Sequence, residues 1–190
     1  MDALEERIMV DGVVVMPNIL RVDSFINHQI DVALYEQMAA EIARLYSDVK
    51  IDRVATIEAG GIALATFVSQ ALGRVPVVYA KKDNSAILSD DVYSATVHSF
   101  TKAKDYVVKV DRRFVNPSEN VLIVDDFLAN GQAGLGLAGI VEQAGARVAG
   151  FAIIIEKAFQ PGRSLLESQG YRVESLARIC RFENSQPIFS

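Results

Sequence analysis

Two segments of the chain are apolar along their whole length. Residues 121–124 read VLIV and residues 148–155 read VAGFAIII. A strand of this kind is covered on both faces, which is typical of a parallel sheet flanked by helices. Residues 53–58 and 75–80 are shorter strand-like segments. Together these segments predict an α/β fold around a central, mostly parallel sheet.

Helix-like segments separate the strands. Asp31 is a suitable N-cap for a helix to about residue 47, where apolar residues recur at the three-to-four spacing of one buried face. Residues 62–72 and 133–144 also follow strands, and a glycine ends each of them. Residues 81–120 are rich in polar and β-forming residues. That region predicts a long loop and an antiparallel hairpin.

The composition narrows the class of protein. A chain of 190 residues fits a single domain, residues 1–190. It has no apolar run near the roughly 18 residues of a membrane span, and its first residues carry acids where a signal peptide needs a basic flank. The single cysteine cannot form a disulfide within the chain. We therefore expect a cytoplasmic protein.

The net charge of −5 predicts no general affinity for nucleic acid or membrane, so a polyanionic ligand needs a local site.

The segment VLIVDDFLANGQA concentrates the candidate chemistry. Asp125 and Asp126 follow the apolar run, at the end of a parallel strand where ligands bind. The next residues lead into a helix whose first amides suit a phosphate, and Gly131 can adopt a positive φ. The paired acids suit a divalent cation or two vicinal hydroxyls. A phosphate beside a diol describes a ribose 5-phosphate. The expected phosphate loop comprises Ala129, Asn130, Gly131, Gln132 and Ala133.

This segment resembles the ribose-phosphate signature of the type I phosphoribosyltransferases. The resemblance covers nearly the whole chain through RVDSFINHQID, TIEAGGIA, VPVVYAKK, SFTK, IEKAFQPGR and GYRVESLARI. It implies the fold of that family, with a small hood formed by the N- and C-terminal segments and a long flexible lid loop over residues 83–100. It also implies a homodimer.

The resemblance further implies a reaction. The phosphoribosyl group of phosphoribosyl pyrophosphate would pass to a purine, with xanthine as the expected base and xanthosine 5′-monophosphate and pyrophosphate as products. Asp125 and Asp126 would be the catalytic acids and accept hydrogen bonds from the ribose hydroxyls. No protein ligand is assigned to a metal, since Mg²⁺ would be bound mainly through the substrate and pyrophosphate.

The remaining site residues are also implied by the resemblance. The xanthine site would comprise Lys157, which favours a carbonyl oxygen because lysine only donates hydrogen bonds, Asn27 opposite the oxygen at position two, the backbone of Leu20, and Phe159 as a stacking ring. The pyrophosphate site would comprise Glu58, Ala59, Gly60, Gly61, Lys81 and Lys82.

Three other functions stay open at this point. An enzyme for hypoxanthine or guanine differs only in what position two of the base requires of Asn27. A regulator that senses phosphoribosyl pyrophosphate and binds DNA would carry a DNA-binding module and a basic face, and this chain shows neither. A dinucleotide-binding protein would carry G-x-G-x-x-G after its first strand, and EAGGIALA lacks that spacing.

Overall fold

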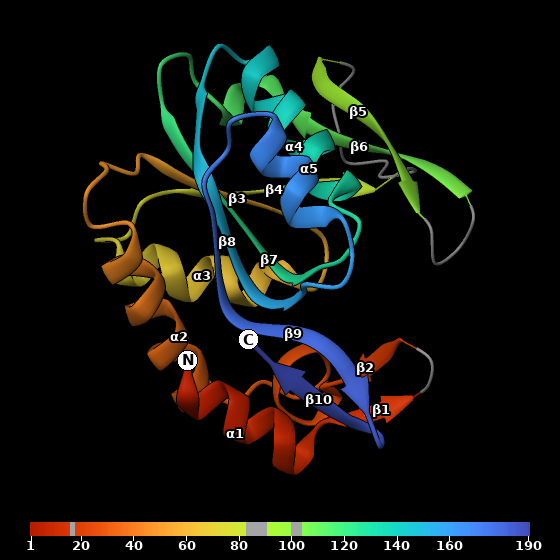
Figure 1. Ribbon diagram of the computed structural model, residues 1–190. Coiled ribbons are helices and arrows are strands. Elements are labelled where there is room, and N and C mark those ends of the chain that lie inside the picture. Colours follow the sequence, from red (N-terminus) through yellow and green to blue (C-terminus); the bar gives the residue numbers. More distant parts are fainter. Residues whose placement is uncertain (16–17, 83–90, 100–103) are drawn as a thin grey trace.

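The computed structural model describes residues 1–15, 18–82, 91–99 and 104–190. Within these residues the main sheet has eight strands in the order β10-β9-β8-β7-β3-β4-β6-β5 (Figure 1). The strands are β3 (Arg53–Ile57), β4 (Val77–Lys82), β5 (Val92–Ser99), β6 (Lys104–Asp111), β7 (Asn120–Leu128), β8 (Arg147–Lys157), β9 (Val173–Glu183) and β10 (Gln186–Phe189).

The centre of the sheet is parallel. Strands β4, β3, β7, β8 and β9 pair side by side in parallel, whereas β6, β5 and β10 pair antiparallel at the two edges. All five residues of β3 are buried, as are Val121 to Val124 of β7. The predicted α/β fold with a mostly parallel sheet is therefore confirmed, and the apolar runs form its covered strands.

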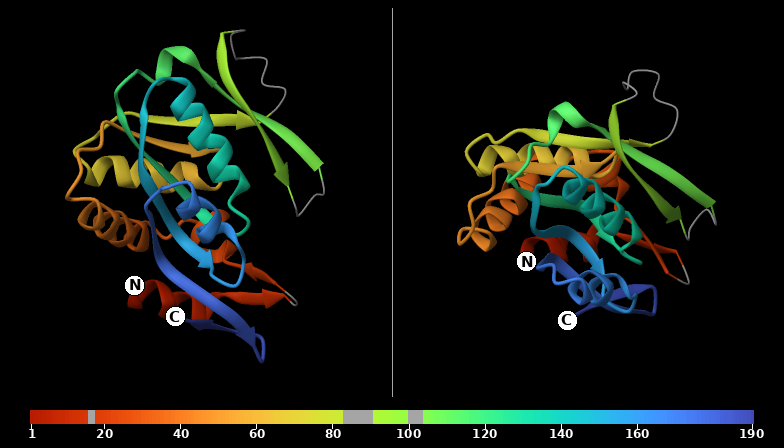
Figure 2. Two further views of the ribbon diagram at one scale, coloured as in Figure 1. Left: turned by 45° about the horizontal axis from the view of Figure 1, so that its top comes forward. Right: turned by 90° about the horizontal axis from the view of Figure 1, so that it is seen from above.

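Helices cover both faces of the sheet. Helices α2 (Val32–Leu45) and α3 (Gly61–Ala71) pack on one face, and α4 (Gln132–Gln143) and α5 (Gly162–Ser168) on the other (Figure 2). The predicted cap of α2 is present, since the backbone N–H of Leu34 donates to Asp31 Oδ1 at 3.1 Å. Each face thus has its own apolar core.

The predicted hairpin is formed by β5 and β6. Val92 to Ser99 pair with Asp111 to Lys104 in an unbroken antiparallel register. The hairpin packs on α4, where a Cβ added to Gly136 would lie 2.6 Å from a methyl carbon of Val97. Of the expected lid, residues 83–90 and 100 lie outside the described residues, and Val92–Ser99 form β5.

The two ends of the chain lie together at one end of the sheet (Figure 1). Helix α1 (Asp2–Asp11) contacts β9 and β10, and the terminal amino group of Met1 donates to the carbonyl oxygen of Leu176. Three further elements lie in this region: the strands β1 (Val13–Val15) and β2 (Ile19–Arg21), which form a hairpin, and a π-helical turn (Asp23–Asn27). We call α1, this hairpin, the π-helical turn and the C-terminal strand β10 the hood. Among the helices that the structure describes, none is long and apolar enough to cross a membrane.

Candidate active site

The two acids lie within the second half of β7. The sequence predicted that the strand would end at the acids, but it continues two residues beyond Asp126, to Leu128. The backbone N–H of Asp126 donates to Asp125 Oδ1, and that of Phe127 to Asp126 Oδ1, both at 3.0 Å. Burial, followed by the negative charge of Asp126, raises the pKa of Asp125 well above its usual range. The site therefore holds two acids in close coupling, and both are partly buried.

The loop from β7 into α4 forms a backbone cradle. Gly131 has a φ of 77° and directly precedes α4, so no side chain at that position caps the helix. The first residue of α5 is hydrogen-bonded to the loop, because the Gly162 N–H donates to the carbonyl oxygen of Ala129 at 2.9 Å. A helix N-terminus with open amides favours an anion. The loop thus lies at the N-terminus of α4, and its role as the phosphate site stays a prediction.

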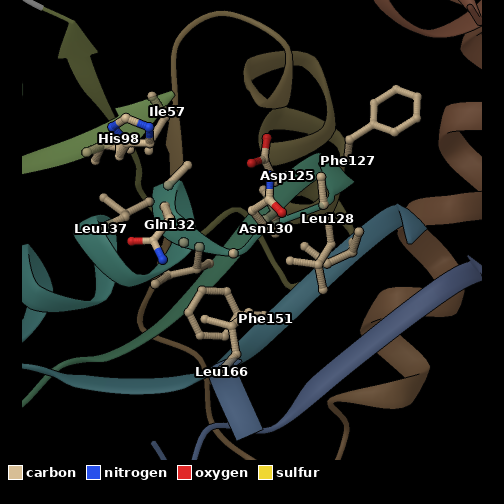
Figure 3. Close-up of a pocket in the computed structure, with 18 of the residues that line it drawn as sticks. Ile57, His98, Asp125, Phe127, Leu128, Asn130, Gln132, Leu137, Phe151 and Leu166 are labelled. Carbon is tan, nitrogen blue, oxygen red and sulfur yellow. The ribbon is translucent and has the colours of Figure 1, made fainter. Parts of the chain in front are cut away.

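A pocket of about 180 Å³ opens at this loop (Figure 3). Asp125 and all five residues of the predicted phosphate loop line it, and Phe151 and Leu166 form its apolar end. Figure 3 shows Asn130 and Gln132 beside this pocket and the ring of Phe127 turned outward. The pocket thus brings one of the two acids and the whole phosphate loop together.

The turn after β3 lies against the acids. Its Glu58–Ala59 peptide is cis, and Gly60 and Gly61 lead into α3. A Cβ added to Gly60 would lie 2.5 Å from Asp126 Oδ2. The ends of β3 and β7 therefore meet, and the predicted pyrophosphate turn adjoins the predicted ribose site.

The two lysines after this turn point in different directions. The prediction that they begin a loop is wrong, because both belong to β4, which pairs Lys81 with Lys109 and Lys82 with Val108 of β6. Successive strand residues face opposite sides of a sheet. Accordingly, Lys81 Nζ lies 5.8 Å from the ring centre of Tyr79, and Lys82 Nζ 5.6 Å from that of Tyr106. The structure brings Lys82, rather than Lys81, to the side of the acids.

Two of the predicted base-binding residues, Lys157 and Asn27, link the hood to the main sheet. Lys157 Nζ donates to the carbonyl oxygen of Asn18 at 2.7 Å, and burial lowers the Lys157 pKa. Asn27 Nδ2 lies 3.5 Å from Asp126 Oδ2, which brings the hood to the acid pair. Among the described residues, neither of these side chains lines the pocket at the phosphate loop. A purine base bound between Lys157 and Asn27 would therefore lie next to the predicted ribose site, on the side of the hood.

The other two predicted base contacts are placed differently. The Leu20 side chain is buried within the hood, and the predicted contact of its backbone with the base stays a prediction. Phe159 is 38% exposed and packs edge-on against Phe182, with ring centres 5.7 Å apart. The residue is therefore partly accessible to solvent.

Two residues with polar side chains that line the pocket were not predicted from the sequence as site residues. His98 and Tyr106 reach the pocket from the β5–β6 hairpin. His98 Nδ1 lies 2.6 Å from Asp105 Oδ1 on the neighbouring strand. The β-forming pattern within residues 81–120 predicts a hairpin, but it gives no sign that the hairpin folds back onto α4.

Comparison with known proteins supplies the family. The model of the phosphoribosyl transferase domain matches residues 22–171. The chain therefore belongs to the phosphoribosyltransferase family. It is similar to the xanthine phosphoribosyltransferase of Leuconostoc mesenteroides, with 50% identity over 189 residues and 100% of both chains covered. It is also 50% identical to the protein of the same name in Clostridioides difficile, over 97% of each chain.

The fold is shared with solved structures. Adenine phosphoribosyltransferase from Thermoanaerobacter pseudethanolicus matches with a TM-score of 0.76 and 23% identity, over 92% of this chain and 99% of the other. The enzyme of the same name from Trypanosoma brucei, in complex with AMP, pyrophosphate and ribose-5-phosphate, matches with a TM-score of 0.78 and 14% identity, over 92% and 79%. These likenesses confirm the type I fold predicted from the sequence.

Proposed function

We propose that this protein transfers the 5-phosphoribosyl group of phosphoribosyl pyrophosphate to xanthine, giving xanthosine 5′-monophosphate and pyrophosphate in purine salvage. One observation carries the proposal. The chain is 50% identical, over its full length, to a protein named xanthine phosphoribosyltransferase. In this chain three features meet at the carboxyl ends of the central parallel strands: the acids of β7, the glycine turn after β3 and the loop before α4.

Each part of the site has a role in this reaction. The amides of residues 129–133 bind the 5-phosphate, and Asp125 and Asp126 accept hydrogen bonds from the ribose hydroxyls. The bond from the anomeric carbon to the diphosphate oxygen breaks as the bond to the purine nitrogen forms, and the proton of that nitrogen is released to solvent. Positive charge grows on the ribose in between. The two carboxylates stabilise that charge, while the turn at Glu58, Ala59, Gly60 and Gly61 and the lysines Lys81 and Lys82 receive the diphosphate.

Mg²⁺ fits this site as a companion of the substrate. In the part of the chain that the structure describes, no group of three or more histidine, cysteine, aspartate or glutamate side chains could hold a metal ion. Mg²⁺ usually keeps several waters and binds through substrate phosphates with one or two carboxylates. We therefore expect the diphosphate to carry the ion, with Asp125 and Asp126 as the nearest carboxylates. Bound there, Mg²⁺ would neutralise the leaving group.

The base is selected between the hood and the end of β8. Lys157 donates to the oxygen at position six, which favours a 6-oxopurine over adenine. Lys157 donates to the carbonyl oxygen of Asn18 in the hood, so an acceptor on this side of β8 is within its reach. Asn27 is placed for the oxygen at position two, the backbone of Leu20 closes the pocket, and Phe159 stacks on the purine.

The assembly and compartment follow as further parts of the proposal. We expect residues 1–190 to act as one domain, as a homodimer in the cytoplasm. A net charge of −5 favours neither nucleic acid nor membrane as a partner. Light scattering during gel filtration tests the dimer.

A substrate-specificity assay tests the activity. The protein is mixed with Mg²⁺, phosphoribosyl pyrophosphate and one purine at a time, and the nucleotide formed is measured. We expect the highest kcat/KM for xanthine, lower values for hypoxanthine and guanine, and no product from adenine. Lys157→Met should lower kcat/KM for xanthine by about 10–100-fold, the scale of a lost charged hydrogen bond. Lys50→Met, at a solvent-exposed ion pair with Asp52, is the control. Efficient use of adenine would contradict the proposal.

A further inference from the structure

The ring of Tyr106 joins two parts of the active site that are distant in sequence. It lines the pocket at the phosphate loop, together with Asp125. The Lys82 ammonium lies over the ring, 5.6 Å from its centre. Burial and, after it, the negative charge of Asp125 raise the pKa of the Tyr106 hydroxyl. Tyr106 is thus within the electrostatic reach of both the acid and the lysine.

The strand register explains this contact. Lys82 pairs with Val108 across β4 and β6, and Tyr106 stands two residues before Val108 on the same face of β6. Diagonal neighbours of this kind are within reach of long and aromatic side chains. The backbone of Lys82 is fixed independently, because its N–H donates to Glu58 Oε1 at 2.7 Å. The ring therefore acts on the flexible part of the lysine.

We infer that Tyr106 is a positioning residue for the pyrophosphate site, because its ring holds the Lys82 ammonium toward the leaving diphosphate. The inference rests on the proposed function. A lysine side chain loses considerable rotamer freedom when it is held in one position. An aromatic face attracts the cation without neutralising it, so the positive charge stays available for the diphosphate. A carboxylate in the same place would compete with the ligand.

Lys81 supplies an internal comparison. Its ammonium also lies over an aromatic ring, that of Tyr79, but on the opposite face of β4. That ring is 40% exposed and does not line the pocket among the described residues. The two lysines are neighbours in sequence, and only the one held by Tyr106 is directed to the acids.

Binding of magnesium pyrophosphate and of ribose 5-phosphate, each measured by calorimetry on the full chain, tests this role. Tyr106→Leu should weaken the binding of magnesium pyrophosphate by about two- to five-fold, the usual scale of an exposed cation–π contact. The same substitution should change the affinity for ribose 5-phosphate less. Tyr106→Phe keeps the ring and should retain the wild-type affinity. In a Lys82→Met background, Tyr106→Leu should have no further effect, because the lysine through which it acts is gone.

Tyr93→Leu is the matched control. Tyr93 stands on the same hairpin, carries Arg112 over its ring at 4.6 Å and does not line the pocket among the described residues. Its loss should leave both affinities unchanged. Equal weakening of the two ligands, or additive effects of the Lys82 and Tyr106 variants, would overturn the inference while leaving the activity intact. A wild-type protein that forms no nucleotide and binds no pyrophosphate would overturn the proposed function and this inference together.

Discussion

Glu58 accepts a hydrogen bond from the backbone N–H of Lys82 at 2.7 Å, and this bond ties the turn after β3 to the end of β4. The turn and the lysine both belong to the proposed pyrophosphate site. Glu58→Ala should therefore raise the KM for phosphoribosyl pyrophosphate by about 5–10-fold, the scale of one lost hydrogen bond. Glu58→Gln keeps an acceptor oxygen and should change KM less. Steady-state kinetics with both variants checks this, and equal effects would assign the role to the charge of Glu58.

Gly131 should not tolerate a side chain. Its φ of 77° is costly for other residues, and an added Cβ would lie 3.0 Å from the carbonyl oxygen of Gly162. Gly131→Ala should destabilise the protein by about 1–2 kcal/mol and weaken ribose 5-phosphate binding at least ten-fold on the ~1.4 kcal/mol-per-decade scale. Gly73→Ala is the control, because Gly73 has a φ of 85° and no atom within 4 Å of an added Cβ. Gly73→Ala should lower the stability of the fold and leave the affinity for ribose 5-phosphate unchanged. Reduced ligand binding in this variant would contradict the prediction.

Replacing Asp125 should stabilise the fold and reduce the activity. The pKa of Asp125 in the folded protein lies above the unfolded value, so the stability contributed by the protonated carboxyl group is complete below the unfolded pKa and is lost as the pH rises from that value through the folded pKa. Asp125→Asn should therefore raise the unfolding temperature of the unliganded protein at pH 7 and lower kcat by about 100-fold or more. The wild-type kcat/KM should fall as the pH drops through this raised pKa. Thermal unfolding and a pH–rate profile measure both effects.

Asp52 supplies the control of opposite sign. Hydrogen bonding from the Asn120 N–H, then from Lys50, lowers the pKa of Asp52. Asp52→Asn should thus lower the unfolding temperature and leave kcat unchanged. A stabilised Asp52→Asn protein, or a destabilised Asp125→Asn protein, would contradict this reasoning.

Glu119 should contribute stability that is lost in acid. The hydrogen bonds from Arg53, at 2.8 and 2.9 Å, are the main cause that lowers the pKa of Glu119 to about 2. The contribution is complete above the usual pKa of about 4.5 and disappears as the pH falls toward 2. Glu119→Gln should cost about 1.5–3 kcal/mol at pH 7, and much less near pH 2. Denaturant unfolding at several pH values measures this.

Glu41→Gln is the matched control for that prediction. Glu41 also makes two hydrogen bonds to an arginine, Arg44, but this pair lies on the exposed side of α2. Exposed ion pairs contribute little to stability. An equal loss in both variants would show that burial of the Arg53–Glu119 pair has no special effect.

The parts of the fold that are encoded locally could be predicted from the sequence. The apolar run before Asp125 is the buried part of β7, and Asp31 caps α2 as expected. Helix α4 begins and ends within one residue of the predicted limits. Each of these features depends on neighbours along the chain, so periodicity and capping are enough to find it.

Features set by tertiary packing were not visible in the sequence. The extension of β4 through Lys82 depends on pairing with β6, and it decides which lysine faces the acids. Tyr106 reaches the pocket only because its hairpin folds onto α4. The residue roles implied by family resemblance, such as those of Asn27 and Lys157, stay predictions until ligands are measured.

The contact between Gly60 and Asp126 has a consequence for how such a protein can diversify. Only a hydrogen atom fits between this turn and the carboxylate, since a methyl carbon would come within 2.5 Å of Asp126 Oδ2. A descendant of this chain could not enlarge the turn while keeping the acid in place. In the proposed function the turn receives the diphosphate and Asp126 binds the sugar, so a side chain introduced at position 60 would disturb both subsites at once.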